Sequence, residues 1–266
     1  MGQPRLMSAD ASVLPTFIIG GAPRSGTTLL CEVLDRHPDV RVARPFVPEP
    51  KVFVTPTTEG RAEYLQRYAA LFAEQGPETA RGEKTSYYLE NEEVPARILE
   101  TLGSVRLLFI VREPVQRAYS NYLWSRQNGL ETLPFAEAVA LEGRRENPLG
   151  PAREYARPFD YLTRGRYATF AERYHAVFGR DAVRFVLYED LERRPAALLR
   201  EIQAFIGVSP LLHEVASAGR VNATPDGGRS LDLAVARDLR ARMAPEVERF
   251  GQLTGLDLTP WGYHEG

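Results

Sequence analysis

The sequence predicts an α/β fold, in which one domain contains a parallel β-sheet flanked by helices. Short apolar runs alternate with longer amphipathic segments along the 266 residues, as strands and helices do when they follow one another in such a fold. The runs are apolar at nearly every position, which is typical of strands buried on both faces of a parallel sheet. No repeat, low-complexity tract or linker divides the chain. We therefore expect residues 1–266 to form a single domain, with residues 1–15 poorly ordered.

The expected strands are short segments rich in Val, Ile, Leu and Phe. They span residues 17–19, 40–42, 105–111 and 182–187, and residues 82–89 form a further strand or a turn. The segment 105–111 is the clearest of them, because it is apolar almost throughout after Arg106.

The expected helices have apolar residues three and four positions apart and are bounded by Pro or Gly. They span residues 27–37, 60–75, 94–102, 114–128, 134–145, 160–178, 195–206 and 231–254. We expect Pro245 to interrupt the last helix, since an internal proline removes a hydrogen bond and clashes with the preceding turn. The expected loops are residues 44–56, 146–158 and 220–230.

The composition excludes several classes of protein. A formal net charge of -2 gives no reason to expect binding to nucleic acid or to an anionic membrane surface. No apolar run approaches the roughly 20 residues of a membrane span, and the N-terminus lacks the apolar core of a signal peptide. The single cysteine, Cys31, excludes an intramolecular disulfide and fits a reducing compartment. We therefore expect a cytoplasmic protein.

A glycine-rich turn follows the first strand, and we call its residues 21–28 the phosphate loop. Gly21 to Thr28 read G-x-x-x-x-G-T-T, which is the pattern of a nucleotide-phosphate loop with one substitution: Thr27 stands where a nucleotide triphosphatase has lysine. The positive charge of the loop lies at Arg24 instead. This pattern favours a P-loop-containing, nucleotide-binding fold with a phosphorylated ligand other than ATP. The alternative is an ordinary strand–turn–helix corner with an exposed arginine.

A second candidate anion site lies where the strand 105–111 ends in Arg112. Open α/β sheets bind ligands at the carboxyl ends of their strands. Many ATP-binding proteins have an aspartate at such a strand end to help hold Mg²⁺, whereas an arginine is suited to an anion. The alternative is that Arg112 forms a salt bridge with a helix carboxylate.

Two further segments combine an acid with one of the only two lysines among 33 basic residues. In residues 44–56, which we call the proline loop, Glu49 stands between Pro48 and Pro50 and precedes Lys51. Lys84 follows Glu83 in the segment 82–89. Each pair could also be an unremarkable surface ion pair.

Four motifs in consistent order resemble the sulfotransferases that use 3′-phosphoadenosine 5′-phosphosulfate (PAPS). Pro23–Thr28 resembles the 5′-phosphosulfate loop of that family, and Arg112–Tyr122 is similar to its 3′-phosphate segment. Gly82–Thr85 resembles a motif of carbohydrate and bacterial members, and Tyr188–Leu191 looks like a fourth motif. The similarity extends from about Phe17 to Gly207.

The resemblance implies a role for each matching residue. The residues that would hold the 5′-phosphosulfate are Arg24, Ser25, Gly26, Thr27 and Thr28. Arg112 and Ser120 would bind the 3′-phosphate. The nucleotide product would be 3′-phosphoadenosine 5′-phosphate (PAP). Glu49 falls where glycosaminoglycan-type members place a catalytic glutamate, and Lys84 would lie beside the acceptor or the transferring group. Arg24 and Lys84 would stabilise charge on the leaving phosphate.

The sequence also departs from parts of that family. Arg24 replaces the lysine of cytosolic members, as it does in tyrosylprotein and some Golgi carbohydrate enzymes, although we expect neither their membrane anchors nor their disulfides here. The phenol and steroid enzymes use a histidine base, but no histidine of this chain falls in a matching motif. Glutamate is therefore the better candidate for the base. Arg229, a candidate for the cofactor site in the loop 220–230, has little motif support.

Together these observations predict a metal-independent enzyme that transfers a sulfuryl group from PAPS to a hydroxyl, or less readily an amine. The acceptor would be a small molecule, a carbohydrate or a lipid. Aromatic residues could line its pocket: Tyr64, Tyr68, Tyr87, Tyr88, Trp124 and Tyr155. The alternatives are a P-loop kinase that uses ATP, disfavoured by the missing Gly-Lys-Ser/Thr, and a non-catalytic nucleotide-binding module.

Overall fold

Five parallel strands form the centre of the fold, in the order β2-β3-β1-β4-β5. They are β1 (Phe17–Gly21), β2 (Val40–Val42), β3 (Ala80–Lys84), β4 (Arg106–Val111) and β5 (Val183–Leu187). The computed structural model describes residues 14–58, 60–72, 78–211 and 231–263. Each strand pairing is parallel, so the predicted α/β fold is confirmed.

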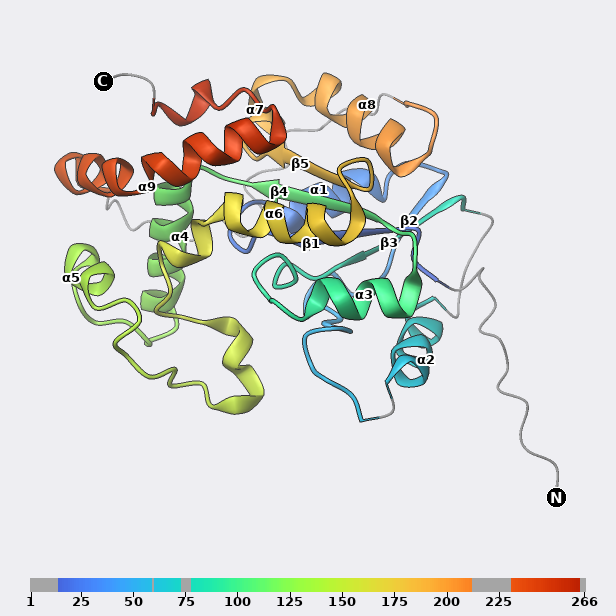
Figure 1. Ribbon diagram of the computed structural model, residues 1–266, viewed down its shortest axis with the longest axis horizontal. Helices are drawn as coiled ribbons and strands as arrows, with labels where there is room; N and C mark the ends of the chain where they lie inside the picture. The colour runs from blue at the N-terminus through green and yellow to red at the C-terminus, as the bar shows by residue number, and fades with distance from the viewer. Residues whose placement is uncertain (1–13, 59, 73–77, 212–230, 264–266) are drawn as a thin grey trace.

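Helices connect the strands and cover both faces of the sheet (Figure 1). They are α1 (Thr27–Leu34), α2 (Arg61–Leu71), α3 (Val94–Leu102), α4 (Pro114–Gln127), α5 (Phe135–Ala140), α6 (Tyr167–Phe178), α7 (Asp190–Arg193), α8 (Pro195–Ile206) and α9 (Leu233–Thr254). Short 3₁₀ turns lie at η2 (Pro151–Ala156), η3 (Thr163–Gly165) and η4 (Thr259–Trp261).

The two faces of the sheet form separate hydrophobic clusters, because successive side chains of a strand point in opposite directions. Ile19 and Leu108 pack with α1 and α8 on one face. Ile18 and Leu107 pack with α2, α3, α6 and α9 on the other. In Figure 1, α3 and α6 lie in front of the strands and α1 lies behind them.

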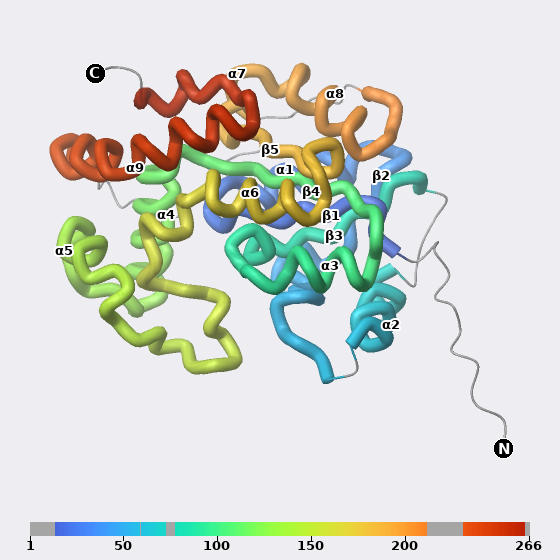
Figure 2. The backbone as a smooth tube through the Cα atoms, viewed as in Figure 1, coloured from blue at the N-terminus to red at the C-terminus, as the bar shows by residue number. Residues whose placement is uncertain are grey.

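A third cluster lies beside the sheet, where α4, α5 and α9 meet. Val115 and Tyr122 of α4 pack there with Phe135 of α5 and with Leu239 and Met243 of α9. Figure 2 shows the backbone leaving β4 and passing through α4 and α5 at one side of the molecule. This cluster fixes α4, which bears Ser120, against the rest of the fold.

Several expected boundaries were wrong. Pro245 does not interrupt α9, which is helical from Leu233 to Thr254. Buried residues on both sides of the proline, Met243 and Val247, hold the helix to the core, and this packing offsets the missing hydrogen bond. The segment 160–178 divides into η3 and α6, since Arg166 has a non-helical ψ of 62°.

Other elements differ in length. The helices expected at 60–75 and 134–145 are the shorter α2 and α5, and α7 was not expected. No described helix is long and apolar enough to cross a membrane. Arg229 lies outside the described residues.

Candidate active site

The phosphate loop joins the central strand β1 to α1. At its end, Gly26 is the N-cap of α1 with a φ of 83°, a left-handed conformation that favours glycine. A Cβ at this position would lie 2.7 Å from the ring of Tyr188. Local geometry and close packing therefore both require glycine here.

The N-terminus of α1 presents unpaired amides. No side chain caps this helix, and within the described residues the N–H groups of Ser25 to Thr28 donate to no backbone carbonyl. The Ser25 hydroxyl is buried beside Tyr167 without a hydrogen bond of normal geometry. Amides and a hydroxyl in this arrangement are suited to an anion such as a phosphate.

Arg24 connects this loop to α4. Its Nε donates to Ser120 Oγ over 3.2 Å, and its backbone has a positive φ of 69°. Burial lowers the pKa of Arg24, and the positive charge of Arg112 lowers it further. The two arginines thus lie near enough to repel, and an anion between them would relieve that repulsion. The two anion sites expected from the sequence adjoin each other.

Arg112 follows β4 at the carboxyl edge of the sheet. Its guanidinium lies 5.1 Å from the centroid of the Tyr188 ring, and its carbonyl accepts the hydroxyl of Tyr167 over 3.0 Å. It forms no ion pair with any carboxylate in the described ranges. The nearby carboxylates have other partners: Glu113 caps α4, and Glu189 accepts from Trp261 Nε1 over 3.0 Å.

Glu49 enters the site from the proline loop. Its Oε1 lies 2.9 Å from Lys84 Nζ and accepts from Ser86 Oγ over 2.8 Å. Its Oε2 accepts from the backbone N–H of Ser86 over 3.1 Å. Three donors thus hold a carboxylate whose side chain is 11% exposed.

Lys84 links the two halves of the site. It is the last residue of β3, which is the neighbour of β1, so the strand end points it at the phosphate loop. Besides Glu49, its Nζ contacts Thr28 Oγ1 at 3.2 Å. The ammonium therefore lies between a carboxylate and the loop that would hold an anion.

Two contacts at this site were missed from the sequence. Ser86 holds Glu49 through both its amide and its hydroxyl, and a hydroxyl residue two positions after Lys84 was the available signal. Lys51 has a φ of 54°, donates to the Glu49 carbonyl, and lies 5.4 Å from the Tyr155 ring centroid. The contact between Lys51 and Tyr155 joins residues that are far apart in the sequence, and no sequence pattern indicated it.

The aromatic candidates divide into two groups. Tyr64, Tyr68 and Tyr88 are buried in the core and pack around Phe53, so the expectation that they line an acceptor pocket was wrong. Tyr87 and Tyr155 lie at the site, with ring centroids 4.9 Å apart. Trp124 is partly buried on α4.

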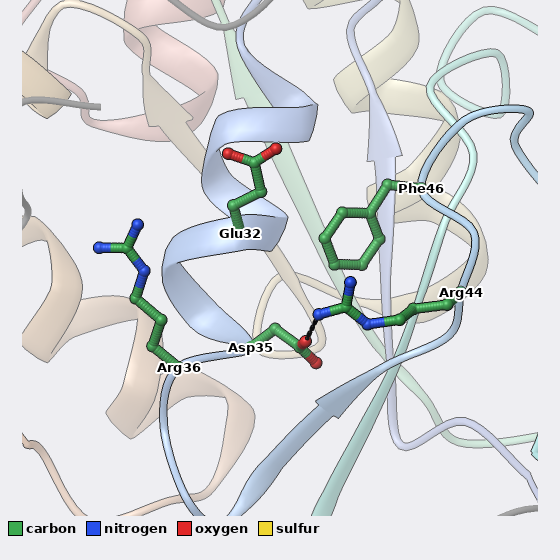
Figure 3. A pocket seen from close by; sticks show the side chains of 5 residues that line it. All are labelled: Glu32, Asp35, Arg36, Arg44 and Phe46. Carbon is green, nitrogen blue, oxygen red and sulfur yellow. Dashed lines mark hydrogen bonds and ion pairs between the residues drawn. The ribbon is translucent and has the colours of Figure 1, made fainter. Parts of the chain in front are cut away.

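A separate hollow lies at the other end of α1, beside the loop after β2 (Figure 3). It has a volume of about 310 Å³, and its walls are Glu32, Asp35, Arg36, Arg44 and Phe46. Arg44 forms an ion pair with Asp35 at 2.5 Å and covers the Phe46 ring. None of the candidate residues that the structure describes lines this hollow. Across the described ranges, no cluster of His, Cys, Asp and Glu is arranged to hold a metal ion.

Comparisons with known proteins agree with the order of these motifs. A family model described as the sulfotransferase family matches residues 15–211. A crystal structure of a sulfotransferase from Alicyclobacillus acidocaldarius superposes with a TM-score of 0.72 at 31% identity, covering 94% of this chain and 99% of that one.

Two curated relatives are more distant. Heparan sulfate glucosamine 3-O-sulfotransferase 3B1 of Mus musculus is 28% identical over 274 residues, covering 94% of this chain and 66% of the relative. Bifunctional heparan sulfate N-deacetylase/N-sulfotransferase 3 of Mus musculus is 27% identical over 205 residues, covering 74% and 23%. The chain thus spans just under two thirds of the length of the first of these relatives.

Proposed function

This chain belongs to the sulfotransferase family, and from that premise we propose that it transfers a sulfuryl group from PAPS to an acceptor hydroxyl, with Glu49 as general base. Transfer of the sulfuryl group to an acceptor amine is the less favoured alternative. The acceptor is a small molecule, a carbohydrate or a lipid, and a cytoplasmic site of action is part of the proposal.

The residues present fit such a donor. PAPS has anionic groups at both ends of its ribose and supplies a sulfuryl group bonded to a phosphate that can leave. Near the phosphate loop, the unpaired amides of residues 25–28 would bind the 5′ group. Arg112 and Ser120 would bind the 3′-phosphate, with Arg24 between the two sites because it contacts Ser120.

The observation on which the proposal depends is the chain of contacts from Glu49 through Lys84 to Thr28. The distances are 2.9 Å from Glu49 Oε1 to Lys84 Nζ and 3.2 Å from Lys84 Nζ to Thr28 Oγ1. A carboxylate able to accept a proton thereby lies next to the loop that would hold the donor. A positioned base and a held donor are what a sulfuryl transfer requires of its enzyme.

Each residue in this chain of contacts then has a defined task. Glu49 removes the proton of the acceptor hydroxyl. Ser86 orients the Glu49 carboxylate through its amide and hydroxyl. Lys84 holds that carboxylate by an ion pair and, with Arg24, places positive charge where the leaving phosphate gains negative charge.

A donor screen with labelled nucleotides tests the proposal. The purified chain is incubated with an extract of cells and either ³⁵S-labelled PAPS or γ-³²P-labelled ATP, with desulfated heparan fragments as one defined acceptor because of the relatives' names. We expect label to move from PAPS and not from ATP, and mass spectrometry then identifies the product. Phosphate transfer would favour a kinase, and nucleotide binding with no transfer would favour a binding module.

A further inference from the structure

A buried carboxyl lies beneath the proline loop and takes no part in the site described above. Glu83 is the neighbour of Lys84 on β3, and its side chain is 0% exposed. Because successive residues of a strand face opposite ways, Lys84 points toward α1 and Glu83 points toward α2. No Lys or Arg in the described part of the chain forms an ion pair with Glu83. An unpaired buried carboxyl is costly unless hydrogen bonds compensate.

Two hydroxyl groups provide those hydrogen bonds. Thr85 Oγ1 donates to Glu83 Oε1, and the Tyr68 hydroxyl donates to Oε2 over 3.2 Å. The Tyr88 hydroxyl lies close to the same carboxyl, and burial together with the negative charge of Glu83 raises the pKa of Tyr88.

The Thr85 and Tyr88 hydroxyls also hold the proline loop. Thr85 Oγ1 accepts the backbone N–H of Lys51 over 2.9 Å, and the Tyr88 hydroxyl accepts that of Phe53 over 3.2 Å. A hydroxyl has a single proton. When the Thr85 proton points to the Glu83 carboxylate, the lone pairs of the same oxygen are free for the Lys51 amide. The carboxylate thereby orients the Thr85 hydroxyl toward the loop.

We propose that Glu83 is a positioning residue: through Thr85, with the Tyr88 hydroxyl beside it, it fixes residues 49–53 and so places the Glu49 carboxylate. This inference rests on the proposed role of Glu49 as the base. A displacement of about 1 Å at a reacting group can cost about a hundredfold in rate. Loss of the Glu83 carboxylate therefore lowers turnover although Glu83 touches neither donor nor acceptor.

The same network gives a dependence on pH. Burial raises the pKa of Glu83 to about 7, although hydrogen bonds from Thr85 and Tyr68 oppose this shift. When Glu83 is protonated on Oε1 it donates a hydrogen bond to Thr85 Oγ1, which then competes with the Lys51 amide for the lone pairs of that oxygen and weakens the hold on the loop. Turnover should therefore rise as pH rises through about 7. The titratable groups around Glu83 are Glu49, Tyr68, Tyr88, Lys84 and Cys31.

Two buried tyrosines offer a matched pair of variants. Tyr88→Phe removes a hydroxyl that accepts the loop amide of Phe53 beside Glu83, whereas Tyr68→Phe removes one that donates to Glu83 and contacts no loop amide. Both changes keep the ring that packs on Phe53. Glu83→Gln tests the carboxylate itself, and Thr85→Val with Thr85→Ser as its conservative partner tests the other hydroxyl.

The readouts are kcat and KM on the acceptor found in the donor screen, the Kd of PAP, and amide hydrogen exchange at Lys51 and Phe53. We expect Glu83→Gln, Thr85→Val and Tyr88→Phe to lower kcat by roughly ten- to a hundredfold, with the Kd of PAP unchanged and faster exchange at the amide concerned. Tyr68→Phe and Thr85→Ser should stay within about threefold of the wild-type kcat, and Glu83→Gln should lose the pH-dependent rise near 7.

Unchanged exchange at both amides in Glu83→Gln would overturn the proposal, and so would equal losses of kcat in Tyr68→Phe and Tyr88→Phe. If Glu83→Gln fails to fold, Thr85→Val and Thr85→Ser decide the question through exchange at the Lys51 amide, because Thr85 is hydrogen-bonded both to Glu83 and to that amide. Failure of the proposed function is seen separately, because the wild-type chain would then transfer no sulfuryl group or Glu49→Gln would keep its turnover.

Discussion

The phosphate loop and the proline loop meet at Lys84, but they are built differently. The phosphate loop depends on backbone: a strand end, a glycine with φ of 83° and the first amides of α1. The proline loop has no regular structure, and side chains from elsewhere hold its backbone. Arg67 of α2 donates to the carbonyl of Val52 over 2.8 Å, and Arg97 of α3 donates to that of Phe53 over 2.9 Å.

This difference suggests a division of labour. A site built from strand ends and helix termini is rigid and suits binding, so we assign the donor to the phosphate loop with Arg112 and Ser120. A carboxylate held by hydrogen bonds can be oriented within narrow limits, so we assign the proton transfer to Glu49. Substitutions at the phosphate loop, Arg112 or Ser120 should alter donor affinity. Substitutions at Glu49 should alter turnover.

The largest expected effect concerns Glu49. Glu49→Gln keeps the shape of the side chain and removes its basicity, and a general base contributes roughly 10²–10⁴-fold. We expect kcat to fall by about two orders of magnitude or more, while the Kd of PAP changes little. Rate measurements on the acceptor from the donor screen check this. Near-native turnover would show that the base lies elsewhere.

The next effect is on affinity. Arg112→Ala removes the guanidinium that we propose binds the 3′-phosphate, and a hydrogen bond to a charged group contributes about 1.5–3 kcal/mol. Donor affinity should fall by about ten- to a hundredfold. Titration with PAP and with an analogue lacking the 3′-phosphate gives the control. An equal loss for both ligands would contradict the assignment of Arg112.

The sequence predicted the phosphate-loop side of the molecule better than the other side, and the reason is physical. Glycine spacing, the strand before Arg112 and the four motifs are local features, so β1 and β4 lie where expected, with α1 three residues shorter than expected. The partners of Glu49 are not local. Ser86 lies 37 residues away, and the hydroxyl network around Glu83 joins β3, α2 and the proline loop. Such contacts leave no periodic pattern in the sequence.

The prediction that Tyr64 and Tyr68 line an acceptor pocket was wrong, because both side chains are buried in the core. Tyr64 and Tyr68 face inward from α2, as the helical spacing predicted. Aromatic residues of a core and of a pocket wall share that spacing, so sequence alone could not separate them. The structure places both against Phe53, at the base of the proline loop.

A smaller effect distinguishes two nucleotides. PAP has anionic groups for both parts of the proposed donor site, whereas ATP has no 3′-phosphate for Arg112 and Ser120, to which we assign that group. At 100 times its Kd a ligand raises the free energy of unfolding by about 2.7 kcal/mol. At the same ligand concentration we expect PAP to raise Tm clearly and ATP to raise it little. Equal shifts in Tm would contradict the two-part site.

Removal of metal ions is expected to have no effect on activity. We expect EDTA to leave sulfuryl transfer unchanged, because Thr27 replaces the lysine of the Mg²⁺-associated Gly-Lys-Ser/Thr sequence and the proposed charge stabilisation comes from Arg24 and Lys84. The assay compares initial rates before and after chelation. Activity that is lost with EDTA and restored by Mg²⁺ or Zn²⁺ would show that a metal takes part.

The division of labour is tested most directly by combining Arg112→Ala with Glu49→Gln. Donor affinity is measured by titration with PAP, and the rate of a single turnover is measured at saturating PAPS. We expect the double variant to have the Kd of Arg112→Ala and the single-turnover rate of Glu49→Gln. The separate roles of Arg112 and Glu49 would be contradicted if Glu49→Gln weakened PAP binding by about tenfold or more, or if Arg112→Ala slowed the saturated single turnover by as much.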